Sequence, residues 1–375
     1  MNYLKNAESF IAAPSYRDKP YSSRGWGGKW HSLCSYQGKL KPAIAHFLIK
    51  SFTCTGDIVL DPLCGVGTIP LEACRQGRIG IGNDLSQLAY CVTKAKIESP
   101  EQNKTLAELE SLRRYIEDHK GELDLNNLPY ASFGFNKTMA DYFEKKTFAE
   151  IILARNYFSA KFEEITPEQA LVMSSIMHIL HGNRPYALSR HSHPLTPYAP
   201  QGKFEYKNLI DHTQTKILAT FKEPLPETYK KGSAILGDCQ NIKGMKVDAI
   251  ITSPPFAGSL KFYMQNWMRL WFSGWDENDF SSTSRHFYDA KQDKDMSIYR
   301  AFFEMCNLNL KNSGIVVLHL GKNSKIDMAS ELITYANEYF KVVYCANEDV
   351  SCLEKHGIKD KGGTTDHQFL FLEKR

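Results

Sequence analysis

Short apolar runs that end in glycine, proline or an acidic residue recur early in the chain. Ile58–Leu60 enters a turn that holds two glycines, and Ile79–Gly82 is followed closely by Asp84. Runs of this length, rich in β-branched residues and stopped by turn residues, are typical of buried strands. Residues with helical spacing follow each run, over 71–75 and 89–95. This β-α-β-α order predicts a parallel sheet with right-handed crossovers.

The strand pattern stops near Pro100 and resumes near Ala234. We therefore expect an α/β fold whose mostly parallel, mixed sheet is interrupted by a long insertion. Three parts follow from this division: a basic N-terminal segment with the first half of the sheet (1–99), the insertion (100–231) and the second half of the sheet (232–375). Further strands are expected over 233–236, 247–252, 314–320, 342–346 and 368–372.

The insertion has a largely helical pattern. Residues 105–119 are rich in charged helix formers, and 137–157 place apolar side chains at helical spacing. Thr166 followed by proline is typical of a helix start, and Gly182 can end that helix. Residues 183–201 then hold four prolines among Arg and His side chains, which predicts an irregular but ordered loop.

Composition indicates a globular protein rather than a membrane or disordered one. Hydrophobic residues make up 42% of the 375 residues and aromatic residues 12%. The sequence lacks an apolar run of the roughly 18 residues that a membrane span needs, and residues 1–17 lack the apolar core of a signal peptide. The nine cysteines are scattered without a CxxC pair. We expect a cytoplasmic protein with reduced, mostly buried thiols and no bound metal.

Positive charge is concentrated near the N-terminus. The net charge is only +4, yet residues 11–50 hold seven Lys and Arg side chains against one Asp, interleaved with five Tyr and Trp rings. Cations with stacking rings suit a nucleic-acid backbone and an unstacked base. A solvated basic face with aromatic rings in the core explains the same pattern nearly as well.

The turn Asp61-Pro62-Leu63-Cys64-Gly65-Val66-Gly67-Thr68 follows the first strand, at the strand end where open α/β sheets bind ligands. Its glycines would let the backbone approach a ligand closely. Pro70 stands near the place where a dinucleotide fingerprint requires a third glycine, which weakens an NAD interpretation. Asp84 ends the second strand and could accept hydrogen bonds from ribose hydroxyls. A tight structural turn with one acid explains these residues equally well when they are taken alone.

A second cluster of residues makes the functional interpretation more specific. A buried strand over 247–252 is stopped by Ser253-Pro254-Pro255-Phe256. The turn Asp61-Pro62-x-x-Gly65-x-Gly67-Thr68, with Glu72-Ala73 downstream, resembles the cofactor motif of amino-directed DNA methyltransferases. The tetrapeptide resembles the catalytic motif of the same family. The resemblance covers about 30–98 and 232–375, and it implies a Rossmann-like class I methyltransferase fold that uses S-adenosylmethionine.

Two further segments are similar to parts of this family. Tyr36-x-Gly38-Lys39-Leu40-x-Pro42 resembles the segment that folds over the methionine part of the cofactor. Gly237-Asp238-Cys239 resembles the turn at which an aspartate meets the adenine amino group. The cofactor-binding residues that the resemblance implies are Tyr36, Lys39, Pro42, Asp61, Pro62, Cys64, Gly65, Gly67, Thr68, Asp84, Leu85, Asp238 and Cys239.

The tetrapeptide suits methylation of an exocyclic amine. Such an amine is a poor nucleophile, because its lone pair is delocalised into the ring, so its N–H bonds must be drawn toward fixed acceptors. The Ser253 hydroxyl and the Pro254 carbonyl can be those acceptors, Pro255 can rigidify the turn, and Phe256 can stack on a base that has left the helix. Methylation at carbon 5 of cytosine would need a thiol nucleophile, normally in a Pro-Cys pair, and the sequence has no such pair.

The resemblance implies a DNA methyltransferase, and serine before the two prolines is commoner among enzymes for N4 of cytosine than among those for N6 of adenine. A restriction-modification setting, with a separate cognate endonuclease, is expected. The insertion is expected to act on double-stranded DNA, with Arg184, Arg190, His191 and His193 facing it. The alternatives are an N6-adenine enzyme, an RNA or protein methyltransferase, and a nucleic-acid-binding protein whose methyltransferase fold has decayed.

Overall fold

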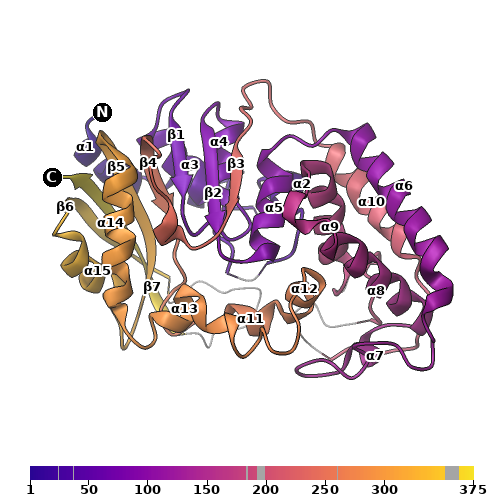
Figure 1. Cartoon of the computed structure of the whole chain (residues 1–375). Helices are drawn as coiled ribbons and strands as arrows, with labels where there is room; N and C mark the ends of the chain where they lie inside the picture. Colours follow the sequence, from indigo (N-terminus) through magenta and orange to yellow (C-terminus); the bar gives the residue numbers. More distant parts are fainter. Residues whose placement is uncertain (24, 37, 183–184, 192–198, 260, 351–362) are drawn as a thin grey trace.

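The computed structural model describes residues 1–375 except 24, 37, 183–184, 192–198, 260 and 351–362 (Figure 1). A seven-stranded sheet in the order β3-β2-β1-β4-β5-β7-β6 forms its centre. β7 pairs antiparallel with both of its neighbours, and the other neighbouring pairs are parallel. The strands are β1 (Ile58–Asp61), β2 (Ile79–Asp84), β3 (Ser233–Leu236), β4 (Val247–Thr252), β5 (Leu310–Asn323), β6 (Phe340–Asp349) and β7 (Thr364–Lys374). This mostly parallel, mixed sheet confirms the predicted Rossmann-like class I methyltransferase fold.

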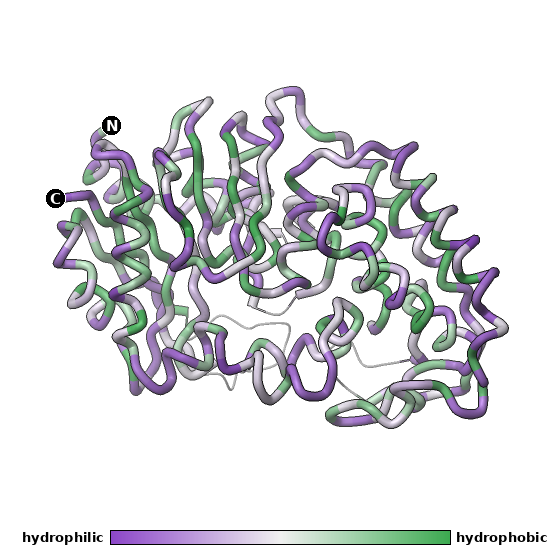
Figure 2. Tube along the Cα trace, in the orientation of Figure 1, coloured by the Kyte–Doolittle hydropathy of each residue, from purple (hydrophilic) through white to green (hydrophobic). Residues whose placement is uncertain are grey.

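Both faces of the central strands are buried, which explains their continuous apolar runs. Val59 and Ile251 pack on one face, against α1 (Tyr3–Ala12) and α3 (Pro42–Phe52). Leu60 and Ile250 pack on the other face, against α14 (Tyr299–Asn309) and α15 (Met328–Ala336). All four side chains are fully buried. In Figure 2 the apolar, green parts of the trace accordingly lie in these strands and on the helix faces turned toward them.

Two helices complete the first half of the sheet. α4 (Thr68–Arg75) follows β1, and α5 (Gln87–Ile97) follows β2. Both start and end within a few residues of the predicted ranges. Ser86 caps α5 by accepting a hydrogen bond from the Ala89 N–H, which is the role a serine at this position commonly has.

The insertion forms a helical body beside α5 (Figure 1), as its pattern predicted. The predicted helix over 137–157 is two helices, because Glu144 accepts the N–H groups of Lys146 and Thr147 and so caps the second. The helix after Thr166 starts as predicted, with a capping box to Gln169. The last helix of the body was not predicted. The helices are α6 (Gln102–His119), α7 (Met139–Tyr142), α8 (Lys145–Ser159), α9 (Pro167–Ile179) and α10 (Leu209–Phe221).

The helical body shares one hydrophobic core with α4 and α5, the helices that flank the first half of the sheet. α5 packs on α9, and α12 (Trp267–Phe272) adds its side chains to the same core. Trp267, Trp271 and Trp275 are 1%, 0% and 5% exposed, so these rings are core residues. Among the helices of the described ranges, none is long and apolar enough to cross a membrane.

Candidate active site

The backbone of the turn between β1 and α4 is tightly constrained. Gly65 and Gly67 have φ angles of +49° and +68°, a region that favours glycine. A Cβ at Gly67 would lie 2.7 Å from the Thr93 hydroxyl oxygen. The Gly67 N–H donates to the Cys64 carbonyl at 2.8 Å, and the Cys64 N–H donates to the Asn83 carbonyl at 2.9 Å. Glycine is therefore required here by the backbone and by the close approach of α5.

Two acidic side chains lie beside this turn with little access to water. Asp84 accepts the N–H groups of Gly65 and Ser86, each at 2.9 Å. Asp61 is 3% exposed and accepts the Leu63 N–H at 3.2 Å. Burial raises the pKa of Asp61 to about 7 and that of Asp84 to about 6.

Neither acid makes an ion pair within the described ranges. A buried carboxylate without a cation is costly, and a ligand that brings an ammonium group or hydroxyl donors offsets that cost. The amino acid and ribose parts of S-adenosylmethionine carry those groups. The two carboxylates at this end of the strands therefore fit that cofactor.

Tyr36 covers the turn. Its ring lies 3.3 Å from the position of a Cβ on Gly65, and it packs on Phe262 with ring centroids 5.4 Å apart. Burial, followed by the charge of Asp84 and more weakly that of Asp289, raises the pKa of Tyr36 well above its usual value. Asp289 accepts the Phe262 N–H at 2.8 Å and is 5% exposed. The aspartate and the two rings thus enclose the same space as the glycine turn.

Sequence reasoning missed Asp289, because its segment carries no motif. It lies on α13 (Tyr288–Lys291), in a stretch that includes α11 (Phe262–Gln265) and α12. Figure 1 shows these three helices in a row along one edge of the sheet, between α14 and the helical body. This stretch connects the two halves of the molecule across the site.

The turn after β3 is also brought to the site. The Gly237 N–H donates to the Asp84 carbonyl at 3.0 Å. Asp238 accepts the Gln240 N–H at 3.1 Å and forms an ion pair with Lys291 at 3.5 Å. Cys239 is buried, with its Sγ 3.5 Å from the Tyr288 hydroxyl. The predicted adenine-binding aspartate is therefore next to Asp84, with a cation already beside it.

The other predicted cofactor residues mostly shape the turn. Lys39 points away from it and donates to the His31 carbonyl at 2.9 Å. Pro42 is the first residue of α3, Thr68 is the first residue of α4 and is 4% exposed, and Leu85 is partly buried after β2. Pro62 accepts the Asn83 side-chain amide at 3.0 Å, and the Cys64 Sγ lies 3.4 Å from the Thr93 hydroxyl.

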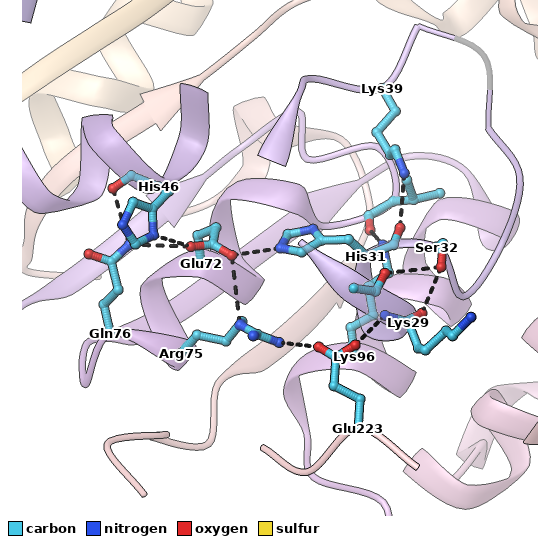
Figure 3. Close-up of polar contacts among 12 residues, drawn as sticks. Lys29, His31, Ser32, Lys39, His46, Glu72, Arg75, Gln76, Lys96 and Glu223 are labelled. Carbon is cyan, nitrogen blue, oxygen red and sulfur yellow. Dashed lines mark hydrogen bonds and ion pairs between the residues drawn. The ribbon is translucent and has the colours of Figure 1, made fainter. Parts of the chain in front are cut away.

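A buried acid on α4 anchors the segment that carries Tyr36 (Figure 3). Glu72 is 2% exposed and lies between two imidazoles: its Oε1 is 2.6 Å from His31 Nε2, and its Oε2 is 2.9 Å from His46 Nδ1. Burial would raise the pKa of Glu72, but hydrogen bonds from His31 and His46 outweigh it and lower the pKa to about 2. Burial lowers the pKa of His31 to about 4. At neutral pH the contact between Glu72 and His31 therefore joins a carboxylate and a neutral imidazole.

Lys96 fixes the turn from behind. It is fully buried on α5, and its Nζ donates to the Val66 carbonyl at 2.5 Å. Burial lowers the pKa of Lys96 well below its usual value. A lysine with no exposed surface is unusual in a core, and the sequence offered no sign of this role.

The Ser253-Pro254-Pro255-Phe256 segment lies at the same edge of the sheet as the glycine turn. β4 lies parallel to β1, with Leu60 opposite Ile250, so the segment starts where β1 ends at Asp61. Thr252, the last residue of β4, is fully buried, and its hydroxyl opposes the effect of burial on the pKa of Asp61. The glycine turn and the predicted catalytic segment are therefore neighbours, as the resemblance required.

The predicted catalytic segment is held by the residue that follows α13 and by its surroundings. Gln292 is 4% exposed and donates to the Pro255 carbonyl at 2.9 Å, while its own carbonyl accepts the Tyr299 hydroxyl at 3.0 Å. Among the described residues no donor contacts the Pro254 carbonyl. The Ser253 Oγ lies 3.0 Å from Nδ1 of His319. Within the described ranges, the Pro254 oxygen that the sequence suggested as an acceptor therefore accepts no hydrogen bond.

Phe256 packs on the sheet. Its ring centroid lies 5.4 Å from that of His319 and 5.7 Å from that of His367. A Cβ on Gly321 would lie 2.5 Å from the ring, so the ring rests directly on the backbone of β5. The ring is partly exposed and is fixed beside Ser253.

Of the predicted DNA-facing residues, Arg184 and His193 lie outside the described residues. Arg190 donates to the Gly202 carbonyl at 2.6 and 2.9 Å and to the Asp141 carbonyl at 3.1 Å. His191 is exposed, and its carbonyl accepts the Gln201 N–H at 2.6 Å. Arg190 therefore ties its loop to α7 in this structure.

Comparison with known proteins supports the methyltransferase assignment. Residues 29–121 match a family described as RMKL-like, methyltransferase domain. The chain is also 29% identical over 68 residues to the type II methyltransferase M.MjaII of Methanocaldococcus jannaschii, a match that spans 18% of this chain and only 13% of that protein.

Similar solved structures include a TehB-like SAM-dependent methyltransferase from Corynebacterium glutamicum (10% identity, 100% of this chain and 97% of that chain, TM-score 0.32). They also include the rRNA methyltransferase aviRa from Streptomyces viridochromogenes (11% identity, 95% and 94%, TM-score 0.35). Scores this low add nothing to what the strand order itself shows. The strand order, the glycine turn and the family match over 29–121 together support a methyltransferase domain that uses S-adenosylmethionine.

Proposed function

We propose that this protein methylates the exocyclic N4 of cytosine in DNA. The observation that carries the proposal is the position of Ser253-Pro254-Pro255-Phe256 at the end of β4, beside the glycine turn. In this position a hydroxyl, a backbone carbonyl and an aromatic ring stand next to the cofactor-binding edge. These are the groups that an unstacked base with an amino group would need.

The residues of the chain account for the chemistry in three ways. The Ser253 oxygen and the Pro254 carbonyl accept the two amino protons and so direct the nitrogen lone pair toward the methyl donor. Gln292 and the prolines hold these acceptors in place before the reaction. Phe256 gives the extruded base a surface to stack on. S-adenosylmethionine supplies the methyl group from an activated sulfonium.

The choice of cytosine rests on the serine. Among the methyltransferases that the tetrapeptide resembles, serine at this position is commoner in those that act on N4 of cytosine than in those that act on N6 of adenine. The alternative within the same family is N6 of adenine.

The basic segment 11–50 and the loop with Arg190 and His191 support double-stranded DNA as the partner. The similarity to a type II methyltransferase supports a restriction-modification setting with a separate endonuclease. We propose these partners as part of the same function.

The test is product analysis on separate substrates. The protein is incubated with labelled S-adenosylmethionine and with pools of DNA, RNA and protein, and nucleosides from the labelled pool are identified by mass spectrometry. N4-methylcytosine in DNA is expected, and Ser253→Ala should lower turnover sharply with nearly unchanged cofactor affinity. N6-methyladenine would refute the cytosine assignment, and label only in RNA or protein would refute DNA as the substrate.

A further inference from the structure

A histidine stands directly behind the catalytic serine. His319 lies on β5 and is 4% exposed, with its Nδ1 3.0 Å from the Ser253 Oγ. It interrupts an otherwise apolar strand that runs from Ile315 to Leu320. Its other ring nitrogen, Nε2, is buried and has no hydrogen-bond partner among the described residues. A buried polar side chain with a single partner needs an explanation beyond packing.

We infer that His319 is a positioning residue that acts through Ser253, taking the hydroxyl proton of the serine as the serine takes a proton from the target amine. This inference rests on the proposed function, since it concerns the same reaction. It adds a proton route that neither the tetrapeptide nor the cofactor motif provides.

The surroundings of His319 keep its ring neutral. Burial, and to a lesser degree the neighbouring His367, lower the pKa of His319 well below its usual value. The ring is otherwise enclosed by Phe256 and Phe369, at centroid distances of 5.4 and 5.1 Å. No carboxylate among the described residues forms an ion pair with it.

The titratable groups near His319 are few. The His367 ring on β7 meets it edge to face, with centroids 4.8 Å apart. Glu348 on β6 lies 4.0 Å from Nδ1 of His367 and so is one group further away. The Glu348 carboxylate also accepts the Tyr16 hydroxyl at 2.9 Å. These side chains leave the Ser253 hydroxyl as the donor that faces Nδ1 of a neutral His319.

The neutral tautomer of His319 that carries its proton on Nε2 decides what the serine can do. When Nδ1 of His319 accepts the Ser253 O–H, the proton of Ser253 is directed away from the target. Both lone pairs of the serine oxygen are then free to accept an N–H of the amine. The histidine therefore orients the acceptor as well as receiving its proton.

The step balances as follows. The amine lone pair forms the N–CH₃ bond while the S–CH₃ bond breaks, and the electron pair of that bond remains on sulfur. One amine proton passes to the Ser253 Oγ as the Oγ proton passes to Nδ1 of His319. His319 then holds one extra proton and one positive charge, equal to the charge lost by the sulfonium. It gives the proton to water when the site opens for product release.

A weak base is sufficient for this transfer. An exocyclic amine that has gained a methyl group and still carries both protons is a strong acid, so the proton moves readily to a histidine whose pKa is lowered. The lowered pKa also keeps Nδ1 unprotonated before the reaction. General base help of this kind contributes about 10²- to 10⁴-fold to the rate.

The test is a double-mutant cycle with Ser253→Ala, His319→Asn and both together. Asn can place its carbonyl oxygen near the position of Nδ1, so it keeps a hydrogen bond to Ser253 but cannot take a proton. His319→Asn should lower kcat by about 10²-fold, with KM and cofactor affinity within about twofold of wild type. In the Ser253→Ala background the same change should cost little more, because the histidine acts through the serine.

Two outcomes of the cycle would overturn the inference. Wild-type kcat in His319→Asn would show that an acceptor alone suffices, and costs that multiply in the double variant would show that the residues act independently. A melting temperature close to that of wild type serves as the control for folding. The cycle is measured on whichever base amine the wild type methylates, so an unexpected base refutes only the proposed substrate.

A second readout does not depend on activity. In protein labelled with ¹⁵N histidine, His319 should be the neutral tautomer protonated at Nε2 between pH 6 and 8, and the Nδ1 signal should shift in Ser253→Ala. An imidazolium, or the tautomer protonated at Nδ1, would overturn the inference even if no substrate had been found.

Discussion

Cofactor affinity should rise with pH, because the buried Asp61 and the half-buried Asp84 must ionise to receive the cofactor. The pKa of Asp84 is about 6 and that of Asp61 about 7, both raised by burial. Below these pKa values Asp84 and Asp61 of the cofactor-free protein are still protonated, whereas aspartates with an ordinary pKa would have lost their protons. Hydroxyl and ammonium donors of the cofactor bind the ionised form, so binding releases those protons and is weakened as pH falls.

The size of the effect follows from the two pKa values. Each group that must lose a proton weakens binding about tenfold for each pH unit below its pKa. At pH 5 this amounts to about tenfold for Asp84 and about a hundredfold for Asp61, so the affinity should be up to about 10³-fold lower than at pH 8. Above about pH 7.5 the affinity should be constant.

Asp84→Asn isolates one of the two groups. At pH 8 it should weaken cofactor binding by about 1 to 3 kcal/mol, roughly 5- to 150-fold, through loss of a charged acceptor. It should also remove one of the two protons released at low pH. Calorimetry from pH 5 to 8, in buffers with different ionisation enthalpies, measures both quantities.

The matched control is Asp248→Asn. Asp248 accepts the Ile58 N–H at 2.9 Å at the opposite end of the same strands, so its loss should leave cofactor affinity unchanged. A flat pH profile in the wild type, or unchanged affinity in Asp84→Asn, would refute the reasoning and leave Asp84 as a helix-capping residue.

Two further predictions concern the surroundings of the site. Glu72→Gln should lower the free energy of unfolding at pH 7 by about 1 to 3 kcal/mol, because a buried carboxylate that accepts hydrogen bonds from His31 and His46 is lost. Because the pKa of Glu72 is lowered to about 2, this contribution is present above about pH 4.5 and is lost as the pH falls through about 2. Urea unfolding measures it, and exposed Glu110→Gln should change stability by only a few tenths of a kcal/mol. Arg190→Ala should reduce the slope of log K against log[salt] for DNA binding by about 1. An unchanged slope with a lower melting temperature would assign Arg190 only to its bonds with Gly202 and Asp141.

Elements governed by local rules were predictable from the sequence. The central strands were found because burial on both faces requires continuous apolar runs, and turn residues mark their ends. The start of α9 was found because Thr166 and the following proline form a local cap. α10, α14 and α15 were missed. α10 and α15 do start at the caps Asn208 and Asp327, but neither has the proline in its first turn that marks the start of α9.

The parts of the site that depend on long-range contacts were not predictable. Asp289, Gln292 and Lys96 act on site residues at least 27 positions away in the chain, and no local pattern distinguishes them. His319 did leave a signal, since a single imidazole in an apolar strand implies a partner. That partner, Ser253, is identified only by the pairing of β4 with β5.

Gly321 on β5 should be required by the ring of Phe256. A Cβ at this position would lie 2.5 Å from Cδ2 and 2.6 Å from Cγ of the ring, far closer than carbon atoms approach. Gly321→Ala should therefore push the ring off the strand and lower stability by about 1 to 3 kcal/mol. Because Phe256 lies beside Ser253, turnover should fall while cofactor affinity is kept.

The clash predicts a specific pattern in the double variant. Phe256→Ala removes the ring and leaves room for the new methyl group, so Gly321→Ala should cost little stability in that background. Thermal unfolding of the two single variants and the double variant measures the coupling. If Gly321→Ala costs the same stability with and without the ring, its effect comes from the backbone of β5 and not from Phe256. Turnover that stays at the wild-type level in Gly321→Ala would show that the position of the ring does not matter for catalysis, and Phe256 would lose its proposed role as the surface on which the base stacks.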